Sequence, residues 1–117
     1  MRLTRRERKA LREYVSALAE RIPNRLESVV LFGSKARGRG RSTRDTDVAV
    51  VVKGGRTPRL RMLVTEPTFE PIARFGVDLS PLLISSSAFR KGSPLIQRIK
   101  REGIPVWSRG RNLLPAA

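Results

Sequence analysis

Apolar residues recur at helical spacing near the start of the chain. The positions that share one helical face are Leu11, Val15, Leu18, Ala19 and Ile22. Because residues three and four positions apart lie on the same side of a helix, this face predicts an amphipathic helix of about five turns. Pro23-Asn24 ends the pattern, since both residues are typical of turns rather than of helix interiors.

Three short runs rich in aliphatic residues predict β-strands. The first is Ser28–Phe32, which ends at Gly33-Ser34. The second is TDVAVVV at residues 46–52, and we expect it to pair antiparallel with the first. The third is Val77–Ile84, where Pro81 favours a sheet edge or a bulge for the second half of the strand, because proline has no N–H to donate to a neighbouring strand.

The segment between residues 58 and 73 contains two prolines that interrupt its helical pattern. Pro67 and Pro71 predict that helices here are short, because proline breaks a helix interior. We therefore expect one helix near Arg59–Thr65 and a further short turn after Phe69.

The last part of the chain contains a second clear helix pattern followed by a strand. Ser93-Pro94 predicts the start of this helix and Gly103 its end. The run Ile104–Trp107 predicts a short strand, in which Trp107 packs in or beside the core. We expect residues 108–117 to form a loose tail.

The length of 117 residues predicts a single domain, residues 1–117, with one hydrophobic core. No internal repeat or linker divides the sequence, and no apolar run approaches the roughly 18 residues that a membrane-spanning helix needs. The basic N-terminus is not followed by the apolar segment of a secretory signal, so we expect a cytoplasmic protein.

The sequence has neither cysteine nor histidine, which narrows the chemistry open to it. Thiolate nucleophiles, disulfides, zinc sites and imidazole bases are excluded. A bound metal would need oxygen ligands, which favour a hard cation such as Mg²⁺. The 25 basic and 10 acidic residues give a net charge of +15, which attracts nucleotides, nucleic acid or an acidic protein surface. Genome composition or adaptation to heat would produce the same excess, so the charge supports a function without identifying one.

The three aspartates of the sequence fall in only two places. Asp45 and Asp47 are two residues apart at the start of a predicted strand, so their side chains project to the same face. Asp78 begins another predicted strand. Neighbouring carboxylates repel one another unless a metal ion or a cationic group neutralises them, which predicts a cation site. The alternatives are a turn cap at Asp45, a solubilising charge at Asp47 and a turn residue at Asp78.

The Gly33-Ser34 step predicts a second component of the site. A small residue at the end of a strand lets a phosphate approach the backbone, where amides and the Ser34 hydroxyl can hold its oxygens. Lys35 and Arg37 would add positive charge. The other arginines of this loop are typical of a solvated surface, and they are Arg39, Arg41 and Arg44.

The order Gly33-Ser34, ten residues, then Asp45-x-Asp47 resembles the DNA polymerase β nucleotidyltransferase superfamily, and specifically its minimal nucleotidyltransferases. The resemblance extends from Leu11 to Trp107, through a later VDL and a closing IKREGIPVW. It implies an α+β fold, in which helices pack on a small mixed β-sheet and a nucleotide binds at the open edge of that sheet.

The resemblance also implies roles for individual residues. The catalytic and metal-binding residues would be Asp45, Asp47 and Asp78, and the nucleotide-binding residues would be Gly33, Ser34, Lys35 and Arg37. Two Mg²⁺ ions would be held by the first two aspartates, and the third would serve the ion beside the attacking hydroxyl and help to take its proton. ATP would be the substrate.

Minimal nucleotidyltransferases of this kind are often paired with a HEPN-type toxin. The resemblance therefore implies an antitoxin that transfers AMP from ATP to a tyrosine of that toxin. One alternative is a non-catalytic module that inhibits a HEPN partner by covering it, or that holds RNA through its basic loop. Another is a nucleotidyltransferase that modifies RNA or a small molecule alone, although we find no acceptor site for it in the sequence.

Overall fold

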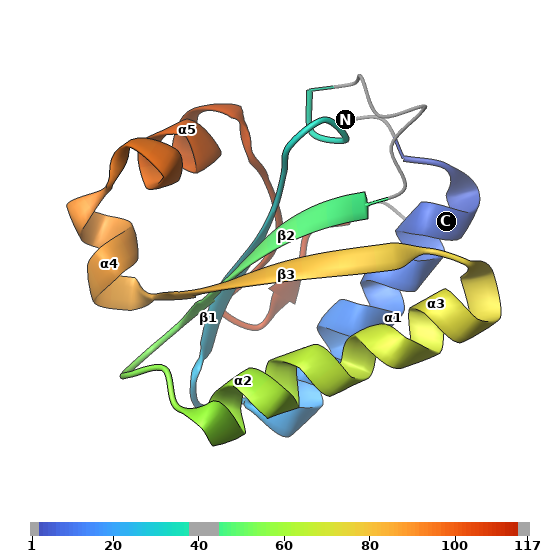
Figure 1. Cartoon of the computed structure of the whole chain (residues 1–117), viewed down its shortest axis with the longest axis horizontal. Coiled ribbons are helices and arrows are strands. Elements are labelled where there is room, and N and C mark those ends of the chain that lie inside the picture. Colours follow the sequence, from blue (N-terminus) through green and yellow to red (C-terminus); the bar gives the residue numbers. More distant parts are fainter. Residues whose placement is uncertain (1–2, 38–44, 115–117) are drawn as a thin grey trace.

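The computed structural model describes residues 3–37 and 45–114 (Figure 1). Within these residues five strands form one mixed sheet in the order β3-β2-β1-β4-β5. The strands are β1 (Leu26–Phe32), β2 (Asp45–Val52), β3 (Asp78–Ser85), β4 (Ile104–Ser108) and β5 (Arg111–Asn112). The expected antiparallel pairing of the first two strands is confirmed, while β2 and β3 run parallel. The arginines at positions 39, 41 and 44, and the last three residues of the expected tail, lie outside the described residues.

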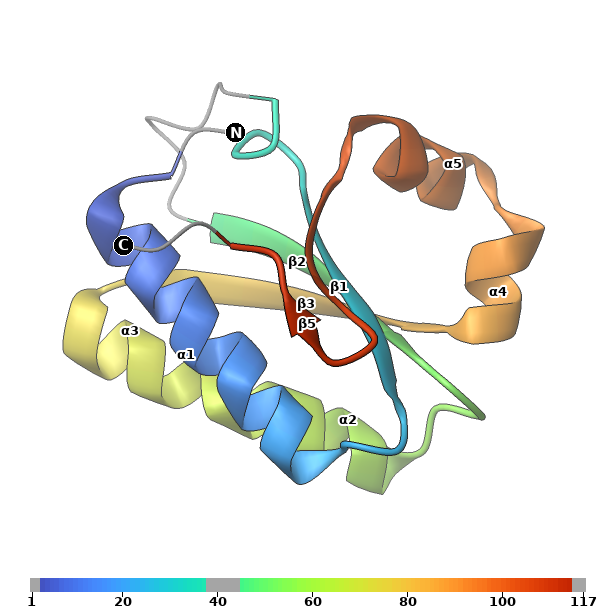
Figure 2. The ribbon, with the colours of Figure 1, turned by 180° about the vertical axis from the view of Figure 1, so that it is seen from behind.

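Helices cover both faces of the sheet. The elements on one face are α1 (Arg5–Arg21), α2 (Pro58–Thr65), the 3₁₀ turn η2 (Glu66–Thr68) and α3 (Phe69–Phe75), and those on the other are α4 (Ser86–Lys91) and α5 (Pro94–Glu102). Figures 1 and 2 show α1 alongside α2 and α3, with α4 and α5 on the opposite side. The α+β architecture with a small mixed sheet is thereby confirmed. No helix in the described part of the chain is long and apolar enough to cross a membrane.

The first helix begins earlier than its apolar pattern does, because a capping box fixes its start. The Thr4 hydroxyl accepts from the Glu7 amide at 3.0 Å, and the Glu7 carboxylate accepts from the Thr4 amide at 2.8 Å. The face that α1 buries comprises Ala10, Leu11, Tyr14, Val15 and Leu18. The helix ends at Arg21, just before Pro23, as the sequence predicts.

The strand β2, which lies between β3 and β1, is buried on both sides along most of its length, and its two faces contribute to different cores. Val48, Val50 and Val52 pack in the larger core with α1 and α2. Ala49 lies in the smaller core with residues of α5 and β3. Because side chains alternate along a strand, every residue of β2 projects to one of these two faces, including Asp45–Asp47 before the buried run.

The proline-containing segment forms a longer helical path than expected. The predicted helix at Arg59–Thr65 is confirmed as α2, but η2 and α3 follow it directly. Pro67 lies at the start of η2 and Pro71 in the first turn of α3, where a missing N–H leaves no hydrogen bond unmade. The prolines thus join three short helical pieces. Pro81 lies in β3 at the sheet edge, as predicted.

Two parts of the chain differ from the predictions. The helix α4 is not foreseen, because its sequence directly follows the β3 run. Only an N-terminal cap marks its start, in which the Ala88 amide donates to the Ser85 hydroxyl at 3.2 Å. The loose tail expected from residue 108 is wrong up to residue 114. Ser108 belongs to β4 and pairs with Arg111 through a two-residue turn whose residues both have positive φ, and Leu114 is buried.

Candidate active site

The fold brings the three aspartates to one end and one face of the sheet. Asp45 and Asp78 are register partners on the parallel strands β2 and β3, whose backbones lie about 4.8 Å apart in such sheets. Asp47 follows two residues further along β2. Ala49 and Leu82, at the matching alternate positions, lie in the core beneath α4 and α5, so the aspartates project from that same face.

A fourth polar residue joins this group and was missed by the sequence analysis. Ser80 is the register partner of Asp47, and it is exposed. Because partners on neighbouring parallel strands project to the same face, its hydroxyl lies on the aspartate face. Only the pairing of β2 with β3 reveals this, since nothing local distinguishes Ser80 from other serines of the chain.

Gly33 lies directly against Asp47. This glycine follows β1 and has a φ of +78°, in the left-handed region that favours glycine. A Cβ atom at this position would lie 2.5 Å from Asp47 Oδ2, closer than real Cβ atoms approach another heavy atom. The sequence predicts that Gly33 lets a phosphate approach the backbone, and the structure adds that this glycine leaves space for the Asp47 carboxylate.

The residues after Gly33 form a turn, Gly33–Arg37, that carries the remaining predicted site residues. The Arg37 amide donates to the Gly33 carbonyl at 3.2 Å, which closes the turn. Ser34 is partly exposed in it. Lys35 is 4% exposed, and its ammonium group pairs with Glu7 of α1. A contact between Lys35 and a phosphate would therefore require this lysine to leave Glu7.

Arg37 lies on the solvent side of the turn. Its Nη1 is 3.4 Å from Glu102 Oε1, at the end of α5. Its positive charge also offsets part of the rise in the pKa of Asp47 that burial and Asp45 cause. Arg37 is thus the one cation of the turn that the described structure places near both solvent and an aspartate of the site.

The electrostatic environment of Asp47 is unfavourable for its own negative charge. Burial raises the pKa of this carboxyl above its ordinary value, the negative charge of Asp45 raises it further, and Arg37 offsets only part of the increase. A cation placed between Asp45 and Asp47 would remove this repulsion.

The donor set fits a magnesium ion that is completed by substrate. Among residues 3–37 and 45–114, no three acidic side chains are grouped closely enough to hold a metal by themselves. Mg²⁺ is commonly bound by one or two carboxylates together with water and substrate phosphates. Asp45 and Asp47 supply two carboxylates on one face of one strand, which meets that requirement.

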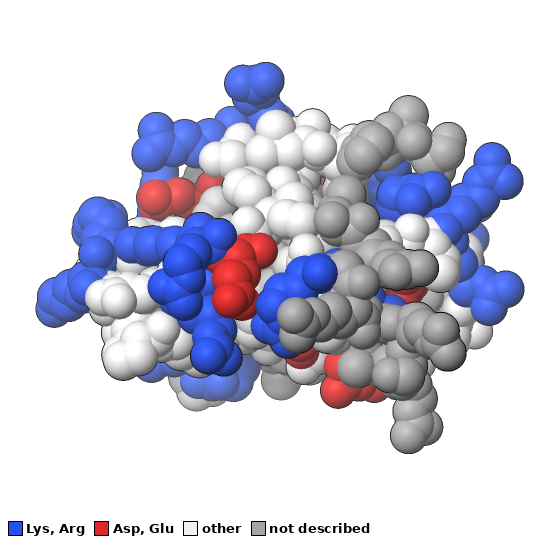
Figure 3. Space-filling view, turned by 90° about the horizontal axis from the view of Figure 1, so that it is seen from above, with Lys and Arg blue, Asp and Glu red and all other residues white. Residues whose placement is uncertain are grey.

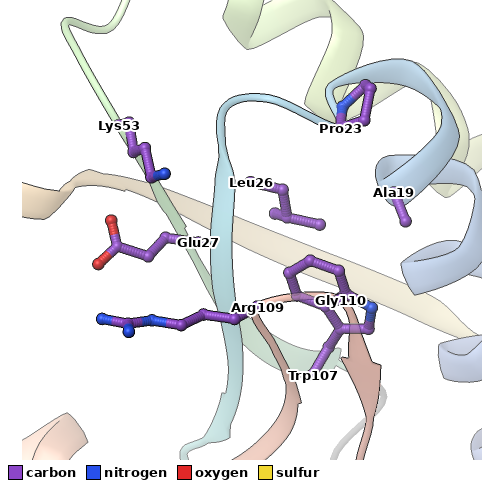
Figure 4. A pocket seen from close by; sticks show the side chains of 8 residues that line it. All are labelled: Ala19, Pro23, Leu26, Glu27, Lys53, Trp107, Arg109 and Gly110. Atoms are coloured by element: carbon purple, nitrogen blue, oxygen red, sulfur yellow. The ribbon is translucent and has the colours of Figure 1, made fainter.

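A separate hollow of about 690 Å³ lies at the other end of the sheet (Figure 4). Its charged residues are Glu27, Lys53 and Arg109. At roughly 3.3 Å per residue, Lys53 lies about 20 Å along the strand direction from Asp47. Trp107 lines this hollow and is 8% exposed, so it serves the core as expected. The hollow therefore contains none of the aspartates, and the candidate site lies elsewhere.

Seen from above in Figure 3, Lys and Arg side chains cover more of the described surface than Asp and Glu side chains, which form a few small groups beside them. This agrees with the net charge of +15. A polyanionic ligand that approaches Asp45 and Asp78 therefore meets a positive electrostatic potential around them.

Comparisons with known proteins agree with this arrangement. A family model described as "Nucleotidyltransferase domain" matches residues 11–103, which include every predicted site residue. A curated relative, the candidate protein adenylyltransferase MJ1305 of Methanocaldococcus jannaschii, is 31% identical over 78 residues, which are 63% of this chain and 52% of the relative. The chain thus spans about half the length of that relative.

Solved structures share the fold. A candidate minimal nucleotidyltransferase is 26% identical with a TM-score of 0.54, and the alignment covers 84% of this chain and 94% of the other. A chain from the complex of a tri-AMPylated HEPN toxin of Shewanella oneidensis with MNT antitoxin is 21% identical with a TM-score of 0.53, over 86% and 71% of the two chains. The aspartate face, the glycine turn and the matched family model together establish that this chain belongs to the nucleotidyltransferase domain family.

Proposed function

We propose that this chain is a Mg²⁺-dependent adenylyltransferase that moves AMP from ATP to a tyrosine hydroxyl of a HEPN-type toxin and so acts as its antitoxin. The observation that carries the proposal is the grouping of Asp45, Asp47 and Asp78 on one face beside the turn at Gly33. The similarity to a candidate protein adenylyltransferase supports a protein acceptor. Because this reaction consumes ATP, we place it in the cytoplasm.

The roles of the carboxylates follow from their positions. Asp45 and Asp47 would hold Mg²⁺, which when bound neutralises phosphate charge and favours departure of pyrophosphate. Asp78, exposed beside Asp45, would accept the proton of the attacking hydroxyl. The hydroxyl oxygen forms a bond to the α-phosphorus while the bond from that phosphorus to the pyrophosphate oxygen breaks.

The turn Gly33–Arg37 would hold the phosphates that leave. The backbone of Gly33 and the Ser34 hydroxyl would contact phosphate oxygens, and Arg37 would add a charge from the solvent side. We assign Lys35 to the support of this turn, because its ammonium group is buried against Glu7. The exposure of Asp45 and Asp78 suits an acceptor as large as a protein.

The proposal is tested by incubating the chain with ATP, Mg²⁺ and a HEPN-type toxin and measuring the intact mass of the toxin. We expect a gain of one or more AMP groups with the native chain and none with Asp47→Asn. Glu20→Gln is the matched control, since it neutralises an exposed carboxylate on α1 and should transfer AMP at the native rate. A stable complex without any mass gain would contradict the proposal and would favour inhibition by binding alone.

A further inference from the structure

An outward-facing stripe of weakly polar and apolar residues runs along α2, η2 and α3. Its members are Pro58, Met62, Thr65, Phe69 and Ile72, which we call the 58–72 stripe. Met62 is 61% exposed, Phe69 62% and Ile72 46%, which is high for side chains of this kind. In both ribbon views α2 and α3 border the molecule along one side (Figures 1 and 2).

The inward side of the same helical path is already packed. Leu60 and Val64 of α2 lie in the main core, and Pro67 and Pro71 are buried further along. The path therefore has one apolar face that the core uses and a second that meets no partner among the residues the structure describes. An ordinary surface helix needs only the first of these faces.

The spacing of the stripe is that of a helix-packing seam. Its members follow one another at intervals of four, three, four and three residues, the pattern that places side chains along one line of contact with a second helix. The backbone remains helical where η2 joins the two helices, since Thr65, Thr68 and Phe69 all have right-handed helical φ and ψ values. One partner helix could therefore contact the stripe along its whole length.

A shallow, open hollow lies along the stripe from Pro58 to Phe69. It measures about 680 Å³, and its lining residues are Pro58, Arg61, Met62, Thr65, Glu66 and Phe69. A shallow apolar groove of this kind suits an amphipathic helix whose apolar side chains lie in it.

Charge decides which protein fits. Arg59 and Arg61 flank the stripe along α2 and are exposed, while the border further along carries Glu66, which is paired with Arg21 at 2.8 Å, and the exposed Glu70. The border of the stripe is therefore positive along α2 and mixed along η2 and α3. A second copy of the chain would bring another net charge of +15 against it, which is unfavourable, whereas acidic side chains would be attracted to the two arginines.

We propose that the 58–72 stripe docks a helix of a partner protein that carries apolar residues at the same spacing, with Asp or Glu on either side of those that face α2. The stripe ends at Ile72, six residues before Asp78, so a helix lying along it extends towards the aspartate end of the sheet. The partner is then the protein that receives AMP, and this part of the inference rests on the proposed function.

The docking surface is tested with two labelled helical peptides of equal length, both with leucines at the stripe spacing. One has glutamate and the other lysine at the flanking positions, and fluorescence anisotropy measures their binding. We expect the native chain to bind the glutamate peptide at least tenfold more tightly than the lysine peptide. Phe69→Ser should weaken binding of the glutamate peptide at least tenfold, and Leu95→Ser, at an exposed leucine of α5, should not change it.

Several outcomes would overturn the inference. They are equal binding of the two peptides, unchanged binding after Phe69→Ser, and dimerisation of the native chain in sedimentation that Phe69→Ser abolishes. Binding to phosphatidylserine vesicles without binding of either peptide would also overturn it, in favour of a membrane surface. Because Phe69 is mostly exposed, Phe69→Ser should unfold within a degree or two of the native melting temperature.

The toxin assay separates failure of this inference from failure of the proposed function. If AMP is transferred equally well by the native chain and Phe69→Ser, the docking surface is wrong and the transferase stands. If the native chain binds the toxin through Phe69 but transfers nothing, the docking surface stands and the transferase is wrong.

Discussion

At the scale of single residues, the site depends on one glycine and one partly buried carboxylate in contact. Gly33 has positive φ, and its missing side chain leaves the space in which Asp47 lies. Burial and the negative charge of Asp45 raise the pKa of Asp47. The ionised carboxylate is therefore disfavoured in the folded chain, and a bound cation would stabilise it. Each of these two features gives a separate prediction.

Gly33→Ala should destabilise the chain and reduce AMP transfer together. The positive φ alone costs a residue with a side chain about 1 kcal/mol, and the new Cβ atom would also displace the Asp47 carboxylate. Gly55→Ala is the matched control, because no atom lies within 4 Å of its Cβ position and its φ is not positive. Denaturant unfolding and transfer rates measure both effects, and equal results for the two variants would contradict this account.

Asp47→Asn should abolish transfer yet leave the free chain slightly more stable at pH 7. Because the pKa of Asp47 is raised in the folded chain, ionisation of this group lowers the free energy of unfolding. This loss of stability appears as the pH rises above the ordinary Asp value of 3.8. We expect a gain on the order of 0.5 kcal/mol at pH 7 that vanishes near pH 3. Thermal unfolding without Mg²⁺ across this range measures it, and a gain that persists at pH 3 would point to another cause.

At the scale of elements, the first helix and the glycine turn are coupled through a single carboxylate. Glu7 caps the start of α1 with one oxygen and pairs with Lys35 through the other. Burial raises the pKa of Glu7, but the hydrogen bond and charge of Lys35, together with the bonds to Thr4, outweigh it and leave this pKa lowered. The turn is therefore held in place by a helix that starts about 30 residues earlier in the chain.

Lys35→Met should destabilise the chain by about 2 kcal/mol, because it leaves the partly buried Glu7 carboxylate without its cationic partner. Arg74→Met removes a more exposed ion pair, with Glu13, and should cost less than about 1 kcal/mol. Since the pKa of Glu7 is lowered, the stabilisation from its pair is complete above its ordinary value of 4.5 and is lost as the pH falls below it. Denaturant unfolding at pH 7 and pH 3 measures this, and equal costs at both values would contradict the assignment.

At the scale of the whole molecule, the aspartates and the 58–72 stripe lie on opposite faces of the sheet, and both extend to the end at which β3 starts. The aspartates project from the face that α4 and α5 cover, whereas the stripe belongs to the helices on the other face. The net charge of +15 surrounds both surfaces and attracts an acidic partner as well as a nucleotide. The net positive charge therefore affects how fast partners associate with the chain more than it affects which fold the chain adopts.

The association rate of the chain with a HEPN-type toxin should therefore fall as salt increases. Between 50 mM and 500 mM NaCl we expect a decrease of about tenfold or more, since added ions screen attraction beyond roughly 10 Å. Arg59→Gln with Arg61→Gln should reduce both the rate at low salt and its salt dependence. Stopped-flow binding measures the rates, and a rate independent of salt would contradict electrostatic attraction.

The sequence by itself determined most helices and strands, because capping residues, apolar spacing and strand alternation act within a few positions of one another. It also identified Asp45 and Asp47 as a pair on one face, since that follows from alternation alone. Only the tertiary structure placed Asp78 and Ser80 across from them, buried Lys35 against Glu7 and set Gly33 against Asp47. These relations depend on strand order, register and burial, which arise from contacts between residues far apart in the chain.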